Sequence, residues 1–128
     1  YEKFFVTKDT IITGLKYWVD AVGADSAVDI AIYDAAGSTL LASKTTPQVV
    51  SAAGIQTNAF EAPVILTAYT LYWRGIAGSN GGTATFGFLP DTLINDDDYG
   101  RVDSAVATCG ATLPAGSSST KRIALIMY

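Results

Sequence analysis

The chain has 128 residues and a net charge of −4, and 49% of its residues are apolar whereas only 16% are charged. This length predicts a single domain, residues 1–128, that buries a core without disulfides or metals. The chain is acidic and has no basic stripe, so we do not expect nucleic acid as a partner. It has no apolar run of roughly 20 residues, so we do not expect a membrane as a partner either.

Short runs of alternating apolar and polar residues recur along the chain, separated by turn residues such as Gly and Pro. We expect strands at 3–8, 10–20, 26–34, 38–44, 55–60, 63–67, 69–77, 83–89, 101–109 and 121–128. No segment carries apolar residues at helical spacing over three turns. The pattern is typical of an all-β, antiparallel sandwich or barrel of about eight to ten strands, without substantial helix.

Alternation also assigns the two faces of several strands, because successive side chains point to opposite sides of a sheet. We expect inward side chains at Ile11, Leu15, Tyr17, Val19, Val28, Ile30, Ile32, Leu71, Trp73, Phe86 and Phe88. We expect outward side chains at Lys16, Trp18, Asp20, Asp29, Ala31, Tyr33, Tyr72, Arg74 and Ile76. A register shift of one residue would expose the whole inward set, so the register is firmly specified.

The last run is apolar on both faces, because Ile123, Leu125 and Met127 alternate with Ala124, Ile126 and Tyr128. Such a strand either lies centrally between two sheets or packs its second face on a neighbouring subunit. The low content of charged residues favours the subunit contact. We therefore predict a homo-oligomer, with contact candidates Ile126, Tyr128 and Ile76.

Cys109 is the single cysteine, so no intrachain disulfide can form. We predict it to be a small buried apolar side chain, since Arg101, the nearest basic residue in sequence, is eight positions away.

The first residue is Tyr1, so the sequence is either processed or a segment of a longer chain.

Four segments resemble a known type of module: 12–15, the run 28–33 with its turn 34–37, 63–66 followed by Tyr72-Trp73, and 111–114 ahead of 122–127. Together they are similar to the jelly-roll β-sandwich domains of tailed-phage virion proteins, such as tail-fibre, head-fibre and capsid-decoration proteins. Tyr69 departs from the Leu-x-x-Gly-x-Tyr-Trp pattern of that family, in which Gly is usual. The resemblance implies a jelly roll, a place on the virion surface, other virion proteins as partners and a trimer, and it carries over no catalytic residue.

The acidic run Asp96-Asp97-Asp98 is the densest cluster of like charge. Carboxylates suit Ca²⁺, which takes six to eight oxygen ligands. The spacing does not match an EF-hand loop, and a solvated loop tip explains the run better. We expect no bound metal or other cofactor and keep these three aspartates only as calcium candidates.

Exposed aromatic residues beside polar ones mark the predicted contact surface. Trp18 shares a face with Lys16 and Asp20, and Tyr72 lies beside Arg74. Such rings suit stacking on a sugar, burial between subunits or cover by a loop of the same domain. We take Trp18, Tyr72, Arg74 and Tyr99 as the contact candidates, with a host-surface glycan as one ligand.

The sequence does not indicate an enzyme. It contains no histidine, so a Ser-His-Asp arrangement is impossible, while Ser-Lys chemistry remains formally open. The run 78–82 lacks the Gly-Lys-Ser/Thr ending of a phosphate-binding loop.

We therefore expect a non-enzymatic structural or adhesive module of a phage particle, extracellular or on the virion surface. An apolar strand face would assemble it, and the loops 78–82, 90–100 and 114–119 would point outward. Two alternatives remain, a carbohydrate-binding module of a secreted protein, and a filament subunit whose strand 3–7 completes a neighbour's sheet.

Overall fold

The computed structural model describes residues 1–23, 26–78, 85–86, 88–89, 100–102, 108–113, 117–119, 122–123 and 125–128. In chain order its strands are β1 (Glu2–Val6), β2 (Thr10–Ala21), β3 (Ala27–Tyr33), β4 (Leu40–Ser43), β5 (Gln48–Val49), β6 (Gly54–Leu66), β7 (Thr70–Gly78), β8 (Thr85–Phe86), β9 (Phe88–Leu89), β10 (Gly100–Val102), β11 (Ser117–Ser119), β12 (Arg122–Ile123) and β13 (Leu125–Met127). These described residues form no helix, and so none that is long and apolar enough to cross a membrane. The expected all-β fold is confirmed.

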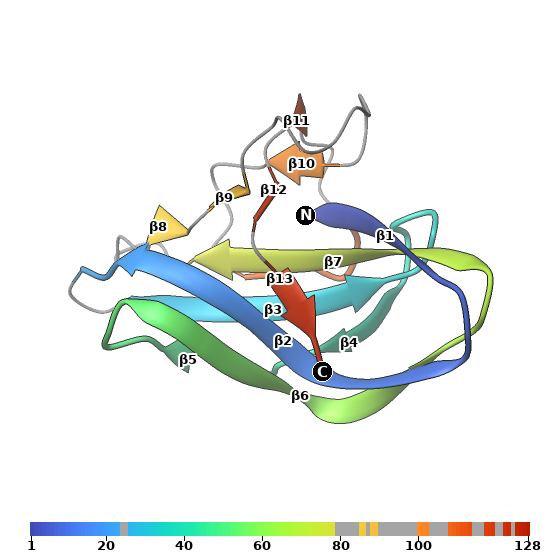
Figure 1. The fold of residues 1–128 in the computed structure, drawn as a ribbon, viewed down its shortest axis with the longest axis horizontal. Coiled ribbons are helices and arrows are strands. Elements are labelled where there is room, and N and C mark those ends of the chain that lie inside the picture. Colours follow the sequence, from blue (N-terminus) through green and yellow to red (C-terminus); the bar gives the residue numbers. More distant parts are fainter. Residues whose placement is uncertain are drawn as a thin grey trace.

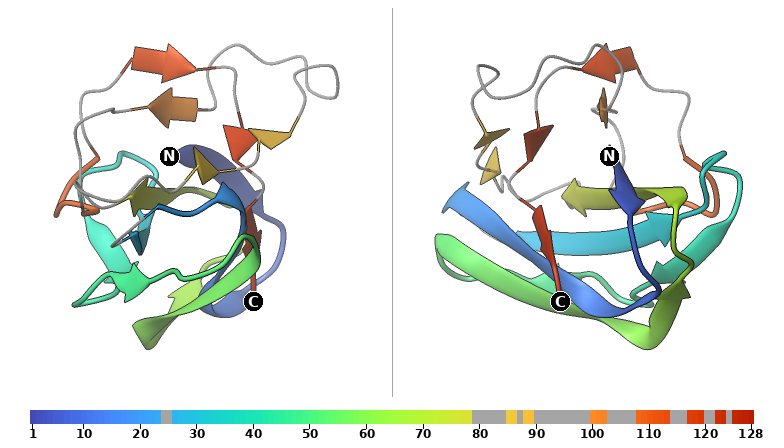
Figure 2. Two further views of the ribbon diagram at one scale, coloured as in Figure 1. Left: turned by 90° about the vertical axis from the view of Figure 1, so that its left-hand side faces the viewer. Right: turned by 45° about the vertical axis from the view of Figure 1, so that its right-hand side comes forward.

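The strands form a sandwich of two antiparallel sheets (Figures 1 and 2). The large sheet has the order β11-β10-β1-β7-β3-β4, and β5 also pairs with β3. The small sheet has the order β13-β2-β6, and β8 also pairs with β2, while β12 pairs with β9 separately. In Figure 1, β2 and β6 run obliquely across β3 and β7. The jelly-roll topology in particular stays a prediction.

The strand bounds differ from the expected ones in several places, and one strand, β5, was not expected at all. The expected runs 55–60 and 63–67 are one strand, β6. Residues 117–119, which we expected in a loop, form β11 and pair with β10. Residues 108–109, expected to end a strand, are not strand at all.

The main core lies between the sheets, and β2 supplies much of it. Leu15, Tyr17 and Val19 are fully buried, as alternation predicts. The inward prediction for Ile11 is wrong, since this side chain is exposed and Ile12 is buried instead. The cause is a register shift between Ile12 and Gly14, which reverses the faces on its two sides.

Strand β3 is buried on both faces, so the outward prediction for Asp29, Ala31 and Tyr33 is wrong. Val28, Ile30 and Ile32 face the main core as expected. The alternate residues face a second apolar cluster on the outer side of the large sheet. The members of that cluster are Tyr1, Ala31, Tyr33, Trp73, Ala77 and Cys109, with Leu40 and Leu113 packed against them.

A segment remote in sequence covers this second cluster. Residues 108–113, here called the strap, are fixed to β3 and the turn after it by three hydrogen bonds. Cys109 N donates to Asp29 Oδ2 at 2.8 Å, Tyr33 Oη donates to the Gly110 carbonyl at 2.8 Å, and Leu113 N donates to the Gly37 carbonyl at 2.7 Å. Gly37 has φ 72°, and a Cβ there would collide with Leu113, so glycine permits both the turn and the close approach.

The expected faces of β7 are wrong at Arg74, which is described with the candidate site, and at three further positions. Tyr72 and Ile76, predicted outside, belong to the main core, and Leu71, predicted inside, is partly exposed. Trp73 is buried as expected, but in the second cluster, where its indole N–H donates to the Ala35 carbonyl at 3.1 Å. Because both faces of β7 are covered near Trp73, alternation of apolar residues could not tell them apart. The side chains of Phe86 and Phe88 lie outside the described part of the structure.

Candidate functional site

The outer face of the small sheet carries the exposed tryptophan. Lys16, Trp18 and Asp20 follow one another at every second position of β2, so they share this face. On the neighbouring strand β6, Thr57 pairs with Lys16 and Ile55 pairs with Trp18. We call these five residues the Trp18 face.

The Trp18 ring is held in place from one side. Its indole N–H donates to Asp20 Oδ1 at 2.7 Å, a charge-assisted hydrogen bond that fixes the ring while leaving it 45% exposed. Ile55 opposite is 67% exposed and offers an apolar surface beside the ring. The face therefore combines a fixed aromatic plane with an aliphatic group, a carboxylate, an ammonium and a hydroxyl.

The end of the chain reaches the same side of the sheet. β13 pairs with β2, so that Ile126 is the register partner of Lys16. The Lys16 ammonium lies 5.5 Å from the centre of the Tyr128 ring, which is partly exposed. One contact candidate, Trp18, and one oligomer candidate, Tyr128, are thus brought to one face by β2.

The other predicted site residues lie elsewhere. Tyr72 is only 7% exposed, and its hydroxyl accepts a hydrogen bond from Thr67 N at 2.9 Å. Arg74 is partly buried and bridges to Glu2 at 2.7 Å, with its guanidinium over the Phe4 ring. Ile76 is buried in the main core. These three residues stabilise the fold and do not form an exposed patch, so their assignment as outward contact residues is wrong.

Several predicted candidates lie outside the described part of the structure: Tyr99, the side chain of Ile126, and the calcium candidates Asp96, Asp97 and Asp98. Within the described part, no group of three or more His, Cys, Asp or Glu side chains is placed to hold a metal ion.

Cys109 is buried as predicted, and burial raises the pKa of its thiol to about 12. This cysteine is a packing residue of the second apolar cluster.

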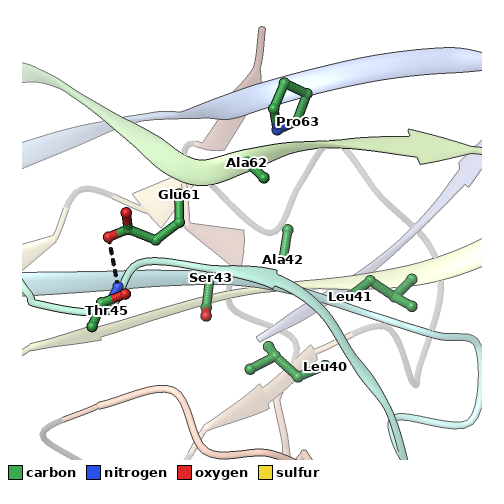
Figure 3. A pocket seen from close by; sticks show the side chains of 8 residues that line it. All are labelled: Leu40, Leu41, Ala42, Ser43, Thr45, Glu61, Ala62 and Pro63. Atoms are coloured by element: carbon green, nitrogen blue, oxygen red, sulfur yellow. Dashed lines mark hydrogen bonds between the residues drawn. The ribbon is translucent and has the colours of Figure 1, made fainter.

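A second feature is a pocket of about 340 Å³ between β4 and β6 (Figure 3), which we call the bulge pocket. Its lining residues are Leu40, Leu41, Ala42, Ser43, Thr45, Glu61, Ala62 and Pro63. Ile12 pairs with Val64 and Gly14 with Ala59, so residues 60–63 of β6 lie opposite Thr13 alone. Three of these bulged residues, Glu61, Ala62 and Pro63, line the pocket.

The opposite side of the bulge is closed by the end of the chain. Thr13 N and Gly14 N donate to the Tyr128 carbonyl, at 2.6 and 3.2 Å. A Cβ on Gly14 would collide with both Asn58 and Tyr128, so this position requires glycine. Contacts between β2, β6 and Tyr128 therefore stabilise the bulge.

Glu61 is the charged group of the bulge pocket. Its Oε1 accepts a hydrogen bond from Thr45 N at 2.9 Å, and Figure 3 shows the side chain reaching from β6 towards Thr45. Hydrogen bonds from Thr45, helped by the positive charge of Lys44, hold the pKa of Glu61 below its usual value. The pocket thus presents a fixed carboxylate beside the apolar groups of Leu41, Ala42 and Pro63.

Sequence reasoning missed Ile55 and the bulge pocket. Ile55 could have been assigned to the outer face by alternation from Phe60, because both residues lie in the expected strand 55–60. Pro63 inside an apolar run was the available signal for the bulge, because proline in strands concentrates at edges and bulges. No feature of the sequence indicated that β4 lies close to this bulge.

The described structure defines a two-layer antiparallel β-domain with an exposed tryptophan on one face and a small pocket at one edge. The chain belongs to the family described as domain of unknown function DUF4082, whose model matches residues 2–101. The strap lies beyond the matched residues. Comparisons with curated proteins and with solved structures found no match.

Proposed function

We propose that this protein is a non-enzymatic adhesive module that works by contact through the Trp18 face. The observation that carries the proposal is the exposed Trp18 ring, locked by Asp20 and flanked by exposed Ile55. An aromatic ring fixed before binding loses little conformational entropy on contact, and aromatic residues with adjacent polar groups dominate binding surfaces.

The setting of the proposal is an extracellular assembly such as the surface of a phage particle, where the module would form a homo-oligomer, a trimer in the resembled family, with other virion proteins as neighbours. The low charged fraction of 16% supports burial of part of the surface. The alternative of strand donation by 3–7 has less support, because β1 pairs with β7 along all five of its residues within its own sheet.

A carbohydrate-binding module is the second candidate, and the same ring favours it. A locked indole plane next to Lys16, Asp20 and Thr57 has the apolar surface and the hydrogen-bonding groups that a sugar ring needs. In that case the chain would bind glycan as a monomer, without self-assembly.

One pair of variants separates these candidates. Trp18→Ala removes the ring, and Phe5→Ala is the control, because Phe5 is an equally exposed aromatic residue on the outer face of the large sheet. Light scattering gives the particle mass and a glycan array gives carbohydrate binding. Loss of oligomers in Trp18→Ala alone supports assembly, and loss of glycan binding by a monomer supports the second candidate. If Trp18→Ala changes neither measurement, the Trp18 face is not the contact surface.

A further inference from the structure

The bulge pocket lies where the open edges of the two sheets approach each other. β4 ends the described order of the large sheet, and β6 ends that of the small sheet. An edge strand presents N–H and C=O groups at the spacing that another extended chain needs for pairing. On β6 the bulge and Pro63, which has no N–H, interrupt this spacing over four residues, whereas the register shift in β4 involves Leu41 alone. β4 is therefore the more regular edge for pairing with another strand.

The charge and the lining of the pocket specify the side chain that would enter it. The carboxylate of Glu61 is oriented by Thr45, and the apolar groups of Leu41 and Pro63 lie beside it. A lysine or arginine side chain fits this combination, because its methylene groups can lie on an apolar surface while its cationic end reaches a carboxylate. The volume of about 340 Å³ is at the small end of the range for ligand pockets and suits one side chain with its neighbouring backbone.

We propose that the bulge pocket binds an extended peptide segment, which pairs with the free edge of β4 and places a lysine or arginine side chain against Glu61. This site is distinct from the Trp18 face, so the test of this proposal does not depend on the function proposed above. It would extend the large sheet by one strand, with main-chain hydrogen bonds giving affinity and Glu61 selecting the basic residue.

The test begins with selection from a random heptapeptide library on the purified protein. We expect the enriched peptides to share one lysine or arginine, with β-branched or aromatic residues at alternating positions. Fluorescence polarisation of the best peptide then measures its Kd. Glu61→Gln keeps an acceptor for Thr45 but removes the charge, and we expect it to weaken binding at least tenfold. Lys44→Gln removes the neighbouring positive charge and should strengthen binding.

Single N-methyl groups along the peptide test the strand pairing directly. Because the N–H groups of a strand point alternately to its two edges, methylation at every second position should abolish binding, and methylation at the positions between should not. Glu61 is exposed and Lys44 is half-buried, and circular dichroism checks that both variants fold. A library without enriched peptides, enrichment without a basic residue, an unchanged Kd in Glu61→Gln or a uniform effect of N-methylation would each overturn the proposal.

Discussion

Asp29 and Cys109 are joined across 80 residues of sequence by a hydrogen bond of 2.8 Å from the cysteine N–H to the aspartate Oδ2. Both residues are buried, and Asp29 Oδ1 also accepts the N–H of Ile30 at 2.8 Å. The carboxylate thereby fixes the strap to β3. Replacing it with alanine leaves the Cys109 N–H without its acceptor, and we expect Asp29→Ala to reduce the free energy of unfolding by about 1–3 kcal/mol.

The reactivity of the Cys109 thiol reports how well the strap is held. With a pKa of about 12, only about one thiol in ten thousand is ionised at pH 8, and the side chain is buried as well. We expect a thiol reagent such as DTNB to react slowly with the native protein and rapidly after denaturation. Asp29→Ala should accelerate the native reaction more than it accelerates global unfolding. Equal acceleration of the two would show that the strap does not open separately.

Asp29 also makes a defined contribution to the pH dependence of stability. Burial raises the pKa of its carboxyl above the ordinary value of 3.8, against the opposing effect of the hydrogen bonds from Cys109 and Ile30. The folded state therefore holds this proton more tightly than the unfolded state. The resulting stabilisation is complete below pH 3.8 and is lost as the pH rises through the folded-state pKa.

Urea unfolding of the wild type and of Asp29→Asn at several pH values isolates this contribution, because Asp34 and Glu61 titrate alike in both proteins. The difference in unfolding free energy, wild type minus variant, should decrease from pH 3.8 upwards and then level off. A difference that increases with pH would mean that the pKa of Asp29 is lowered by folding.

Tyr69 has a left-handed backbone conformation, with φ 57°, and its ring is 79% exposed. The turn is held because Tyr69 N donates to the Val6 carbonyl at 2.7 Å and Ala68 N donates to Asp9 Oδ1 at 2.7 Å. A side chain in this conformation costs about 1–2 kcal/mol, whereas glycine adopts it without that cost but loses more chain entropy on folding. We expect Tyr69→Gly to stabilise the protein by about 0.5–1 kcal/mol in urea unfolding. Tyr69→Ala, which keeps the Cβ, is the control and should give no such gain.

The ion pair of Glu2 and Arg74 is largely buried, with side-chain exposures of 8% and 15%. Arg74→Leu leaves the glutamate buried beside an apolar group, and we expect a loss of about 3 kcal/mol in unfolding free energy. The double variant with Glu2→Gln should recover at least half of this loss. Additive effects in the double-mutant cycle would show that the two side chains do not interact.

The sequence was sufficient for most of the strands but not for their faces. Alternation placed Leu15, Tyr17 and Val19 correctly, since only one side of β2 is buried there. It failed at Tyr33 and Tyr72, because the strap and Tyr1 cover the outer side of the large sheet and bury both faces. That cover depends on contacts between residues far apart in sequence, which a local pattern does not contain.

The candidate site, too, could be predicted only in part from the sequence. Trp18 was predicted as a contact residue because its neighbours at i−2 and i+2 are charged, and the structure places it on an exposed face. Arg74 was also predicted as a contact residue because it lies beside Tyr72, but in the structure it forms an ion pair with Glu2 on another strand. The bulge pocket depends on a register shift between β2 and β6 and on the approach of β4. Neither feature can be derived from the residues that line the pocket.

The central claim is that the Trp18 face is the contact surface, and ¹⁹F NMR of protein labelled with 5-fluorotryptophan tests it most directly. The chain has two tryptophans, exposed Trp18 and buried Trp73, and Trp18→Phe assigns their resonances. As oligomers form at rising concentration, or as a glycan identified on the array is added, the Trp18 resonance should shift or broaden while that of Trp73 keeps its chemical shift. Association or glycan binding that leaves the Trp18 resonance unchanged would contradict the claim.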